Sequence, residues 1–96
     1  MIYKFNDEQY ALMQKYIKSC IESEYVKPRI QHNIVFNDEL QTVTVQNTDI
    51  VEFMSAADDA IIEFGMVNED HLNSLGCKLQ LLYDEIYYQT KHASSD

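Results

Sequence analysis

The chain is short of the residues that break regular structure. Its 96 residues include two Gly, one Pro and no Trp. Few Gly and Pro favour helices over a loop-rich fold, and two Gly are too few for a Gly-rich phosphate-binding loop. Cys20 and Cys77 are too few for a disulfide framework. We therefore expect buried, reduced thiols in a cytoplasmic protein, with a single disulfide as the alternative.

Targeting signals are also missing from the sequence. Residues 1–6 contain no basic region followed by an apolar run, which predicts that there is no signal peptide. No apolar run approaches the length of a membrane span. The length predicts one domain, which we place at residues 1–92, followed by a polar tail at residues 93–96.

Positive charge is absent from the middle of the chain. Between Arg29 and Lys78 there is no Lys or Arg, whereas nine carboxylates lie in the same stretch. The formal net charge is −9, and the acids and bases outside this stretch cancel, so all of the excess negative charge lies within it. A sequence pI near 4.5 argues against nucleic acid or an anionic membrane as a ligand. It predicts a partner that is basic or that normally binds a polyanion.

Capping signals and spacing predict a first helix at about residues 7–25. Asn6 is a typical N-cap, and Gln9 three residues later completes a capping box. Apolar residues then follow at helical spacing, and Pro28 disfavours helical geometry at the residue before it. Residues 1–5 alternate apolar and polar, which predicts either a short strand or an extended lead-in.

A β-hairpin is predicted next. Residues 30–36 and 40–46 are rich in β-branched and apolar side chains, and residues 37–39 between them have the composition of a turn. In the second strand, Val43 and Val45 are expected on a buried face, with Thr42 and Thr44 on a wet face.

Two further helices complete the predicted α+β fold, a single small domain with the order helix, β-hairpin, helix, helix. The second helix, residues 50–64, is expected to end at Gly65 in a left-handed cap. The third is expected to begin at the N-cap Asn68 and to place a wide apolar arc in the core: Leu72, Leu75, Leu79, Leu82 and Ile86. Gly76 within this arc indicates close approach of another backbone.

Known arrangements for catalysis are not visible. The cysteines and the three histidines are scattered, which argues against a zinc site, and Cys77 lies six residues after His71, so this pair is poorly aligned on one helix for nucleophilic catalysis. Adjacent acids such as Asp58 and Asp59 point about 100° apart on a helix, so they form no catalytic dyad by themselves. We expect no enzymatic activity, no cofactor and no metal.

The acids of the second helix instead predict a partner-binding surface. Like charges one helical turn apart repel, so an acidic row without bases either maintains solubility or meets a basic partner. Rows spaced along a helix at roughly 6 to 10 Å are suited to a groove built for phosphates, which lie about 3.4 Å apart along one strand. The residues expected on this surface are Asp38, Glu39, Glu52, Asp58, Asp59, Glu63, Glu69 and Asp70.

In size, charge and element order the chain resembles the small acidic anti-CRISPR inhibitors carried by phages of Gram-positive bacteria. The resemblance also rests on residues 37–46, a turn and a β run, and on residues 49–56, Asp-Ile-Val-Glu-Phe-Met-Ser-Ala, which begin an acidic amphipathic helix. It implies a DNA-mimic inhibitor that covers the DNA-entry or PAM-reading surface of a nuclease with carboxylates. No role of an individual residue follows from it.

A second interpretation uses the third helix. Small acidic α+β proteins also act as immunity proteins or as assembly partners, and the apolar arc with Tyr83, Tyr87 and Tyr88 would then form the interface. The same arc raises the alternative of a homodimer. Binding through carboxylates should weaken steeply with salt, whereas binding through an apolar interface should not.

Overall fold

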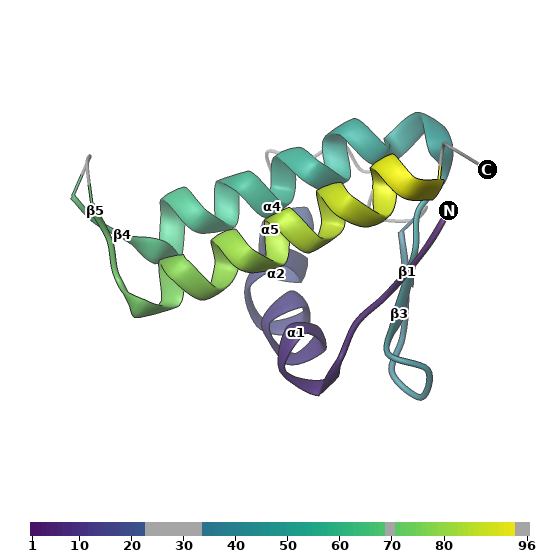
Figure 1. Cartoon of the computed structure of the whole chain (residues 1–96), viewed down its shortest axis with the longest axis horizontal. Coiled ribbons are helices and arrows are strands. Elements are labelled where there is room, and N and C mark those ends of the chain that lie inside the picture. The colour runs from purple at the N-terminus through teal and green to yellow at the C-terminus, as the bar shows by residue number, and fades with distance from the viewer. Residues whose placement is uncertain (23–33, 69–70, 94–96) are drawn as a thin grey trace.

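Two long helices lie side by side across the molecule, and a short helical stretch and a small sheet pack against them (Figure 1). A computed structural model describes residues 1–22, 34–68 and 71–93. The helices are α1 (Asp7–Leu12), η1 (Met13–Ile17), α2 (Lys18–Ile21), η2 (Asn47–Asp49), α4 (Ile50–Gly65) and α5 (Ser74–Ala93). The strands are β1 (Ile2–Lys4), β2 (Val35–Asn37), β3 (Thr42–Thr44), β4 (Met66–Asn68) and β5 (His71–Leu72).

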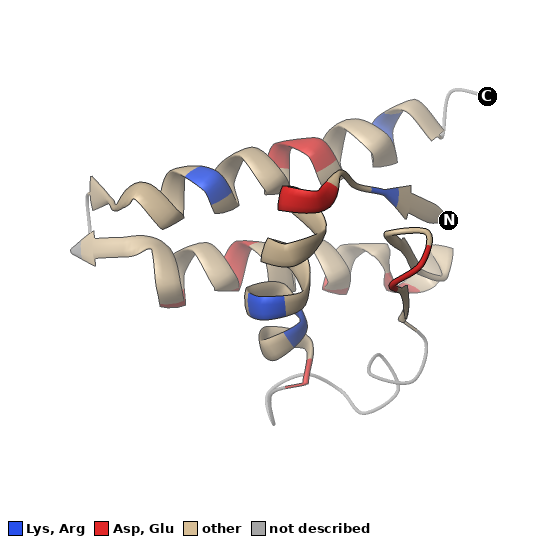
Figure 2. Cartoon of the chain, turned by 90° about the horizontal axis from the view of Figure 1, so that it is seen from below, with Lys and Arg blue, Asp and Glu red and all other residues tan. Residues whose placement is uncertain are grey.

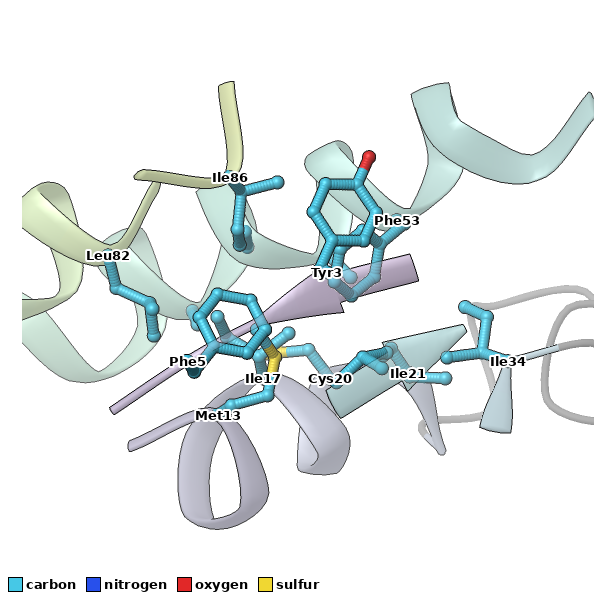
Figure 3. Packing of buried hydrophobic residues seen from close by; sticks show 14 of the residues in the cluster. Tyr3, Phe5, Met13, Ile17, Cys20, Ile21, Ile34, Phe53, Leu82 and Ile86 are labelled. Atoms are coloured by element: carbon cyan, nitrogen blue, oxygen red, sulfur yellow. The ribbon is translucent and has the colours of Figure 1, made fainter. Parts of the chain in front are cut away.

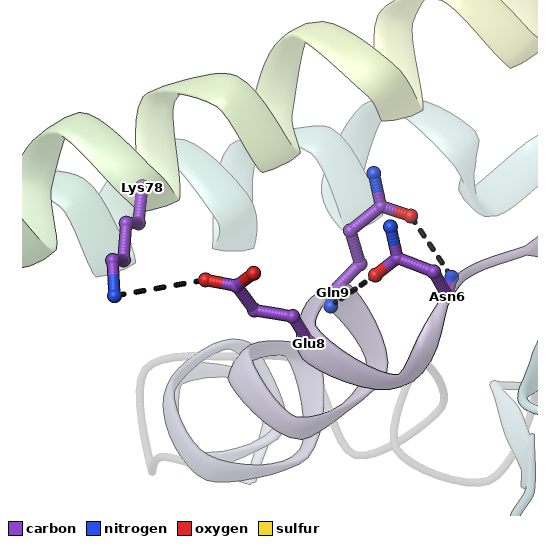
Figure 4. Close-up of polar contacts among 4 residues, drawn as sticks. All are labelled: Asn6, Glu8, Gln9 and Lys78. Atoms are coloured by element: carbon purple, nitrogen blue, oxygen red, sulfur yellow. Dashed lines mark hydrogen bonds and ion pairs between the residues drawn. The ribbon is translucent and has the colours of Figure 1, made fainter.

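The first helical stretch begins where its capping signals predict. The backbone N–H of Gln9 donates to Asn6 Oδ1 at 2.8 Å, and the backbone N–H of Asn6 donates to Gln9 Oε1 at 3.0 Å (Figure 4). This reciprocal pair is the predicted capping box. The stretch is helical to Ile21, through a π-helical segment at η1. Residues 23–25, the predicted end of this helix, lie outside the described residues.

The predicted hairpin is part of a three-stranded antiparallel sheet with the order β1-β3-β2. Ile2 to Lys4 pair with β3, so the strand alternative for the start of the chain is confirmed. Val43 and Val45 are buried as expected. Thr42 is also buried, against the expectation of a wet position, at the end of β3 where it lies between its cross-strand partners Lys4 and Asn37, whereas Thr44 is exposed as expected. The start of the first predicted hairpin strand, residues 30–33, lies outside the described part.

Strand β1 is also held by α5 on its other side. The side-chain amide of Gln89 donates to the carbonyl of Lys4 at 2.7 Å and accepts from the backbone N–H of Lys4 at 3.0 Å. The hydroxyl groups of Tyr3 and Thr90 lie 2.7 Å apart and share a hydrogen bond. The sheet is therefore fixed to the C-terminal half of α5 by polar contacts as well as by the core.

The core gathers side chains from the sheet and from all three helical stretches (Figure 3). Tyr3 and Phe5 of the N-terminal segment meet Phe53 of α4 and Ile86 of α5, and the ring centroids of Tyr3 and Phe53 are 5.1 Å apart. The largest fully buried side chains are Tyr3, Met13, Ile17, Val43, Val45, Phe53, Leu79, Leu82 and Ile86, together with Asp49. The α+β domain predicted from the sequence is confirmed.

The connection between α4 and α5 differs from the prediction. Residues 66–68 and 71–72 pair as a short antiparallel hairpin, and α5 begins at Ser74 rather than after Asn68. The capping residue is Asn73, whose Oδ1 accepts from the backbone N–H of Gly76 at 2.7 Å. Leu72, predicted in the core of the helix, lies in β5 and is exposed. Leu72 has the same spacing from Leu75 as a residue of the helix would have, but its backbone is extended in β5, so the helical pattern in the sequence begins before the helix does.

The two glycines meet where α4 and α5 come closest. A Cβ atom on Gly76 would lie 2.1 Å from the carbonyl oxygen of Gly65, and one on Gly65 would lie 2.4 Å from the Cα of Gly76. The predicted close approach at Gly76 is confirmed. The predicted left-handed cap at Gly65 is wrong, because neither glycine has a positive φ. Gly65 is instead needed for space, so that two helix backbones can touch.

Candidate partner-binding surface

The outward side of α4 combines apolar and acidic side chains. Its most exposed apolar residues are Val51 at 74% and Ile62 at 61%. Ser55, Asp58 and Asp59 are exposed along the same side of the helix. The opposite side is buried, and it consists of Phe53, Ala56, Ala57, Ala60 and Ile61. Both aliphatic residues are therefore exposed on a helix whose other apolar residues are buried or partly buried.

The acidic row lies slightly to one side of this apolar stripe. Glu52 is partly buried, and Glu63 is exposed near α2. The thiol of Cys20 in α2 donates to Glu63 Oε2 across 3.9 Å. Burial, followed by the negative charges of Glu63 and Asp59, raises the pKa of Cys20 to about 11. The stretch α2 therefore lies against the edge of α4 that carries Glu63.

We call Glu52, Asp58, Asp59 and Glu63 the acidic face of α4. Among the residues that the structure describes, no ion pair joins any of these four carboxylates to a lysine or arginine. The ribbon of α4 accordingly carries acidic segments and no basic one in Figure 2, whereas α5 carries both. The Lys78 ammonium pairs instead with Glu8 at 3.6 Å, on the side of α5 that faces α1 (Figure 4). The described residues therefore leave the charge of the acidic face without a neutralising base.

A hollow of about 400 Å³ opens beside the acidic face. We call it the Tyr83 hollow, because Tyr83 of α5 forms one side of it. The rest of its lining comes from α4: Val51, Met54, Ser55, Asp58 and Asp59. The hollow thus has an apolar wall and two carboxylates at its border, a feature that the helical spacing of α4 alone does not reveal.

A second hollow, of about 850 Å³, lies between the N-terminal strand and the end of α5. We call it the Tyr87 hollow. Its lining residues are Met1, Ile2, Asn47, Ile50, Met54, Tyr87, Thr90, Lys91 and Ala93. Met54 lines both hollows, so they adjoin across one flexible side chain. In the sequence, the tyrosines that flank the leucine series of α5 are the signal that points to this hollow.

The predicted turn acids lie apart from the acidic face of α4. Asp38 and Glu39 follow β2 at the end of the sheet remote from α4 (Figure 1). The hydroxyl of Tyr10 donates to Asp38 Oδ1 at 2.7 Å, and the side-chain amide of Gln14 donates to the same oxygen. Burial and the hydrogen bond to Asp38 raise the pKa of Tyr10. Asp38 therefore joins the turn to the first helical stretch, and the structure does not place it beside Asp58.

Glu69 and Asp70, the last two predicted surface residues, lie outside the described residues. Of the eight predicted residues, the structure brings together four, those of the acidic face. Asp49, the remaining acid of the described middle stretch and not one of the predicted surface residues, is fully buried at the start of α4. Among the described residues, the acidic face of α4 therefore comprises fewer carboxylates than the charge count of the sequence indicates.

Residues 1–22, 34–68 and 71–93 contain no group of three His, Cys, Asp or Glu side chains placed to hold a metal ion. Over the same residues, no helix combines the length and the apolar character needed to cross a membrane. Comparisons with protein-family models, with curated proteins and with solved structures give no match.

Proposed function

We propose that this protein is a non-catalytic inhibitor that binds a basic, nucleic-acid-binding protein and blocks its nucleic-acid site. The observation that carries the proposal is the acidic face of α4, four carboxylates without an ion pair to a base in the described chain. Leaving like charges unneutralised along one helix costs stability, so the arrangement calls for a compensating role. A groove lined by Lys and Arg supplies the missing counter-charges.

The geometry of a helix supports mimicry of a phosphate backbone. Glu52 and Asp59 are separated by roughly 10 Å along the helix axis, and Asp59 and Glu63 by roughly 6 Å. Phosphates on one strand of a duplex are separated by about 3.4 Å, so the carboxylates match intervals of two or three phosphates. A protein site that neutralises phosphates would meet charges of the same sign at compatible distances. The resemblance to anti-CRISPR inhibitors makes a nuclease the class of partner to test first.

The test is displacement from DNA. Proteins that a heparin column retains from a lysate are bound to beads carrying duplex DNA, and the purified protein is then added at low salt. We expect it to release one basic protein, which mass spectrometry identifies, and the release should disappear at high salt. The variant Glu52→Gln, Asp59→Asn, Glu63→Gln should release at least about tenfold less, because facing charges steer and hold the complex.

Two controls make the result decisive. Glu8→Gln together with Glu22→Gln removes two exposed carboxylates from the N-terminal helical stretch and leaves α4 intact. These changes should leave the release unaffected. The proposal fails if nothing is released, or if the α4 variant releases as much as the unmodified protein.

A second candidate function uses the exposed side of α5. Leu81 is 68% exposed, and Tyr88 and Tyr87 are 56% and 53% exposed, which is a large apolar area for one helix of a small domain. An immunity or assembly role through this side, or a homodimer, predicts binding that survives high salt. Leu81→Ser together with Tyr88→Ser would abolish such binding, whereas the α4 variant would not. Sedimentation at high micromolar concentration tests the homodimer directly.

A further inference from the structure

The Tyr83 hollow indicates what kind of segment the acidic face receives. We propose that it takes one large apolar side chain from a basic segment of the partner, while Lys or Arg residues flanking that side chain meet Asp58 and Asp59. This inference rests on the proposed function and narrows it. It replaces a purely electrostatic surface with a charged border around an apolar anchor point.

Three side chains make the lining of the hollow apolar. Val51 is 74% exposed, and Met54 and Tyr83 are partly buried beside it. Methionine is unbranched and adapts its shape to an incoming group, and a tyrosine ring offers a flat apolar surface with a polar end. A space of about 400 Å³ bounded by such groups can accommodate a large side chain. Without a partner these apolar surfaces contact water, and covering them with an apolar side chain is favourable.

The charges beside the hollow determine which charge the bound segment must carry. Asp58 and Asp59 belong to the lining of the hollow, and both are exposed without an ion pair to a base in the described residues. An apolar segment that carries acids would bring like charges together, whereas Lys or Arg beside the anchor would be attracted. A second copy of this chain is a poor occupant for the same reason, because each copy carries a net charge of −9. Charge complementarity therefore selects a basic partner segment.

The hollow also limits the length of the contact. Its lining on α4 runs from Val51 to Asp59, which is roughly 12 Å along the helix axis. One apolar anchor side chain and the Lys or Arg residues next to it are enough to fill that distance. Central apolar contacts with a charged border are the usual arrangement of residues that dominate protein–protein binding.

Two matched probe peptides test the inference. Both are Lys-rich dodecapeptides labelled with a fluorophore; one carries a central Phe and the other carries Ala at that position. Binding to the whole protein is measured by fluorescence anisotropy at low salt. We expect the Phe peptide to bind at least about tenfold more tightly than the Ala peptide. Asp58→Asn with Asp59→Asn should weaken both peptides.

The chain offers a matched control for the anchor. Val51→Ser removes a lining residue of the hollow, whereas Ile62→Ser removes another exposed aliphatic residue of α4 that does not line it. Val51→Ser, and Ser55→Trp, which fills the space, should remove most of the advantage of the Phe peptide. Ile62→Ser should preserve it. Circular dichroism of each variant checks that the helices are intact.

The outcomes separate the inference from the function beneath it. Equal binding of the two peptides, with both weakened by Asp58→Asn and Asp59→Asn, overturns the anchor and supports the acidic face. An equal effect of Val51→Ser and Ile62→Ser on the Phe advantage also overturns the anchor. Absence of binding by either peptide at low salt counts against the acidic face as a site for bases. Val51-dependent self-association in sedimentation would assign the hollow to a second copy and overturn the inference.

Discussion

The inner and outer sides of α4 differ in what their residues contribute. The inner side consists of Phe53 and small residues that let α5 and the first helical stretch pack closely, and it ends in the contact between Gly65 and Gly76. The outer side consists of acids, Ser55 and two exposed aliphatic residues that bury nothing within the described chain. One helix therefore separates two requirements. The inner side determines whether the protein folds, and the outer side is available for a partner.

The largest effect on stability is expected in the core beneath this helix. Leu79 of α5 is 1% exposed, so Leu79→Ala leaves a cavity and should lower the free energy of unfolding by about 2 to 5 kcal/mol. Leu81→Ala is the matched control, because the same residue type in the same helix is 68% exposed. Urea denaturation measures both. A loss below about 1 kcal/mol for Leu79→Ala would mean that the core is built elsewhere.

The contact between the helices should give the next largest effect. Gly76→Ala places a Cβ atom within 2.1 Å of the Gly65 carbonyl oxygen, so one backbone must move. We expect a loss of about 1 to 3 kcal/mol. At an exposed helical position the same change would be stabilising by roughly 1 kcal/mol, so the sign of the effect is informative. Thermal unfolding that shows a more stable variant would contradict the close approach of α4 and α5.

A smaller loss is expected at the turn that follows β2. Asp38→Ala removes the acceptor for the Tyr10 hydroxyl and for Gln14, which should cost about 1 kcal/mol. Glu39→Ala, in the same turn and exposed, should change the free energy of unfolding by less than about 0.5 kcal/mol. Equal effects in urea denaturation would show that the carboxylate of Asp38 does not hold the turn.

The outer side of α4 should tolerate large changes of charge. In the triple variant Glu52→Gln, Asp59→Asn, Glu63→Gln, we expect the free energy of unfolding to change by no more than about 0.5 kcal/mol, because exposed charges contribute little to folding. Its melting temperature should stay within a few degrees of the unmodified protein. A clear loss of stability would assign these acids to the fold and weaken the proposed function.

The smallest effect is expected at the border between the two sides. Burial is the main cause of the raised pKa of Cys20, and Glu63 adds to it. Glu63→Gln should therefore lower this pKa and increase the thiolate fraction, so that iodoacetamide modifies Cys20 a few-fold faster at mildly alkaline pH. Asp58→Asn is the control, because Asp58 does not contribute to the shift. Peptide mass spectrometry separates Cys20 from the exposed Cys77.

Local signals in the sequence were sufficient for much of the fold. The capping box at Asn6 and Gln9 and the buried positions of Val43 and Val45 each depend on neighbours a few residues away, and both are present in the structure, although Thr42 departs from the predicted alternation. Such signals act before distant contacts form, so they can be read from one chain. The close approach at Gly76 was predicted because a glycine inside an apolar helical arc leaves room for another backbone.

The remaining features depend on partners that are distant in the sequence. Asn68 and Asn73 are both good capping residues, and only the pairing of β4 with β5 decides in favour of Asn73. The helical spacing of α4 could not show that α2 covers the edge near Glu63. The Tyr83 hollow combines α4 with α5, so the pattern of either helix alone leaves it invisible. The sequence predicts the acids of α4 but not the Tyr83 hollow beside them.

The two hydrogen bonds between the Gln89 side chain and the Lys4 backbone affect the tendency of the protein to aggregate at high concentration. An edge strand with open N–H and carbonyl groups can recruit strands from other molecules and start fibril growth. The backbone N–H and carbonyl of Lys4 both bond to the side-chain amide of Gln89. A strand from another molecule therefore cannot form a continuous series of backbone hydrogen bonds with β1. Natural sheets often protect such edges with proline or with charged side chains. Here a glutamine from a helix gives the same protection, which limits the routes to amyloid-like association.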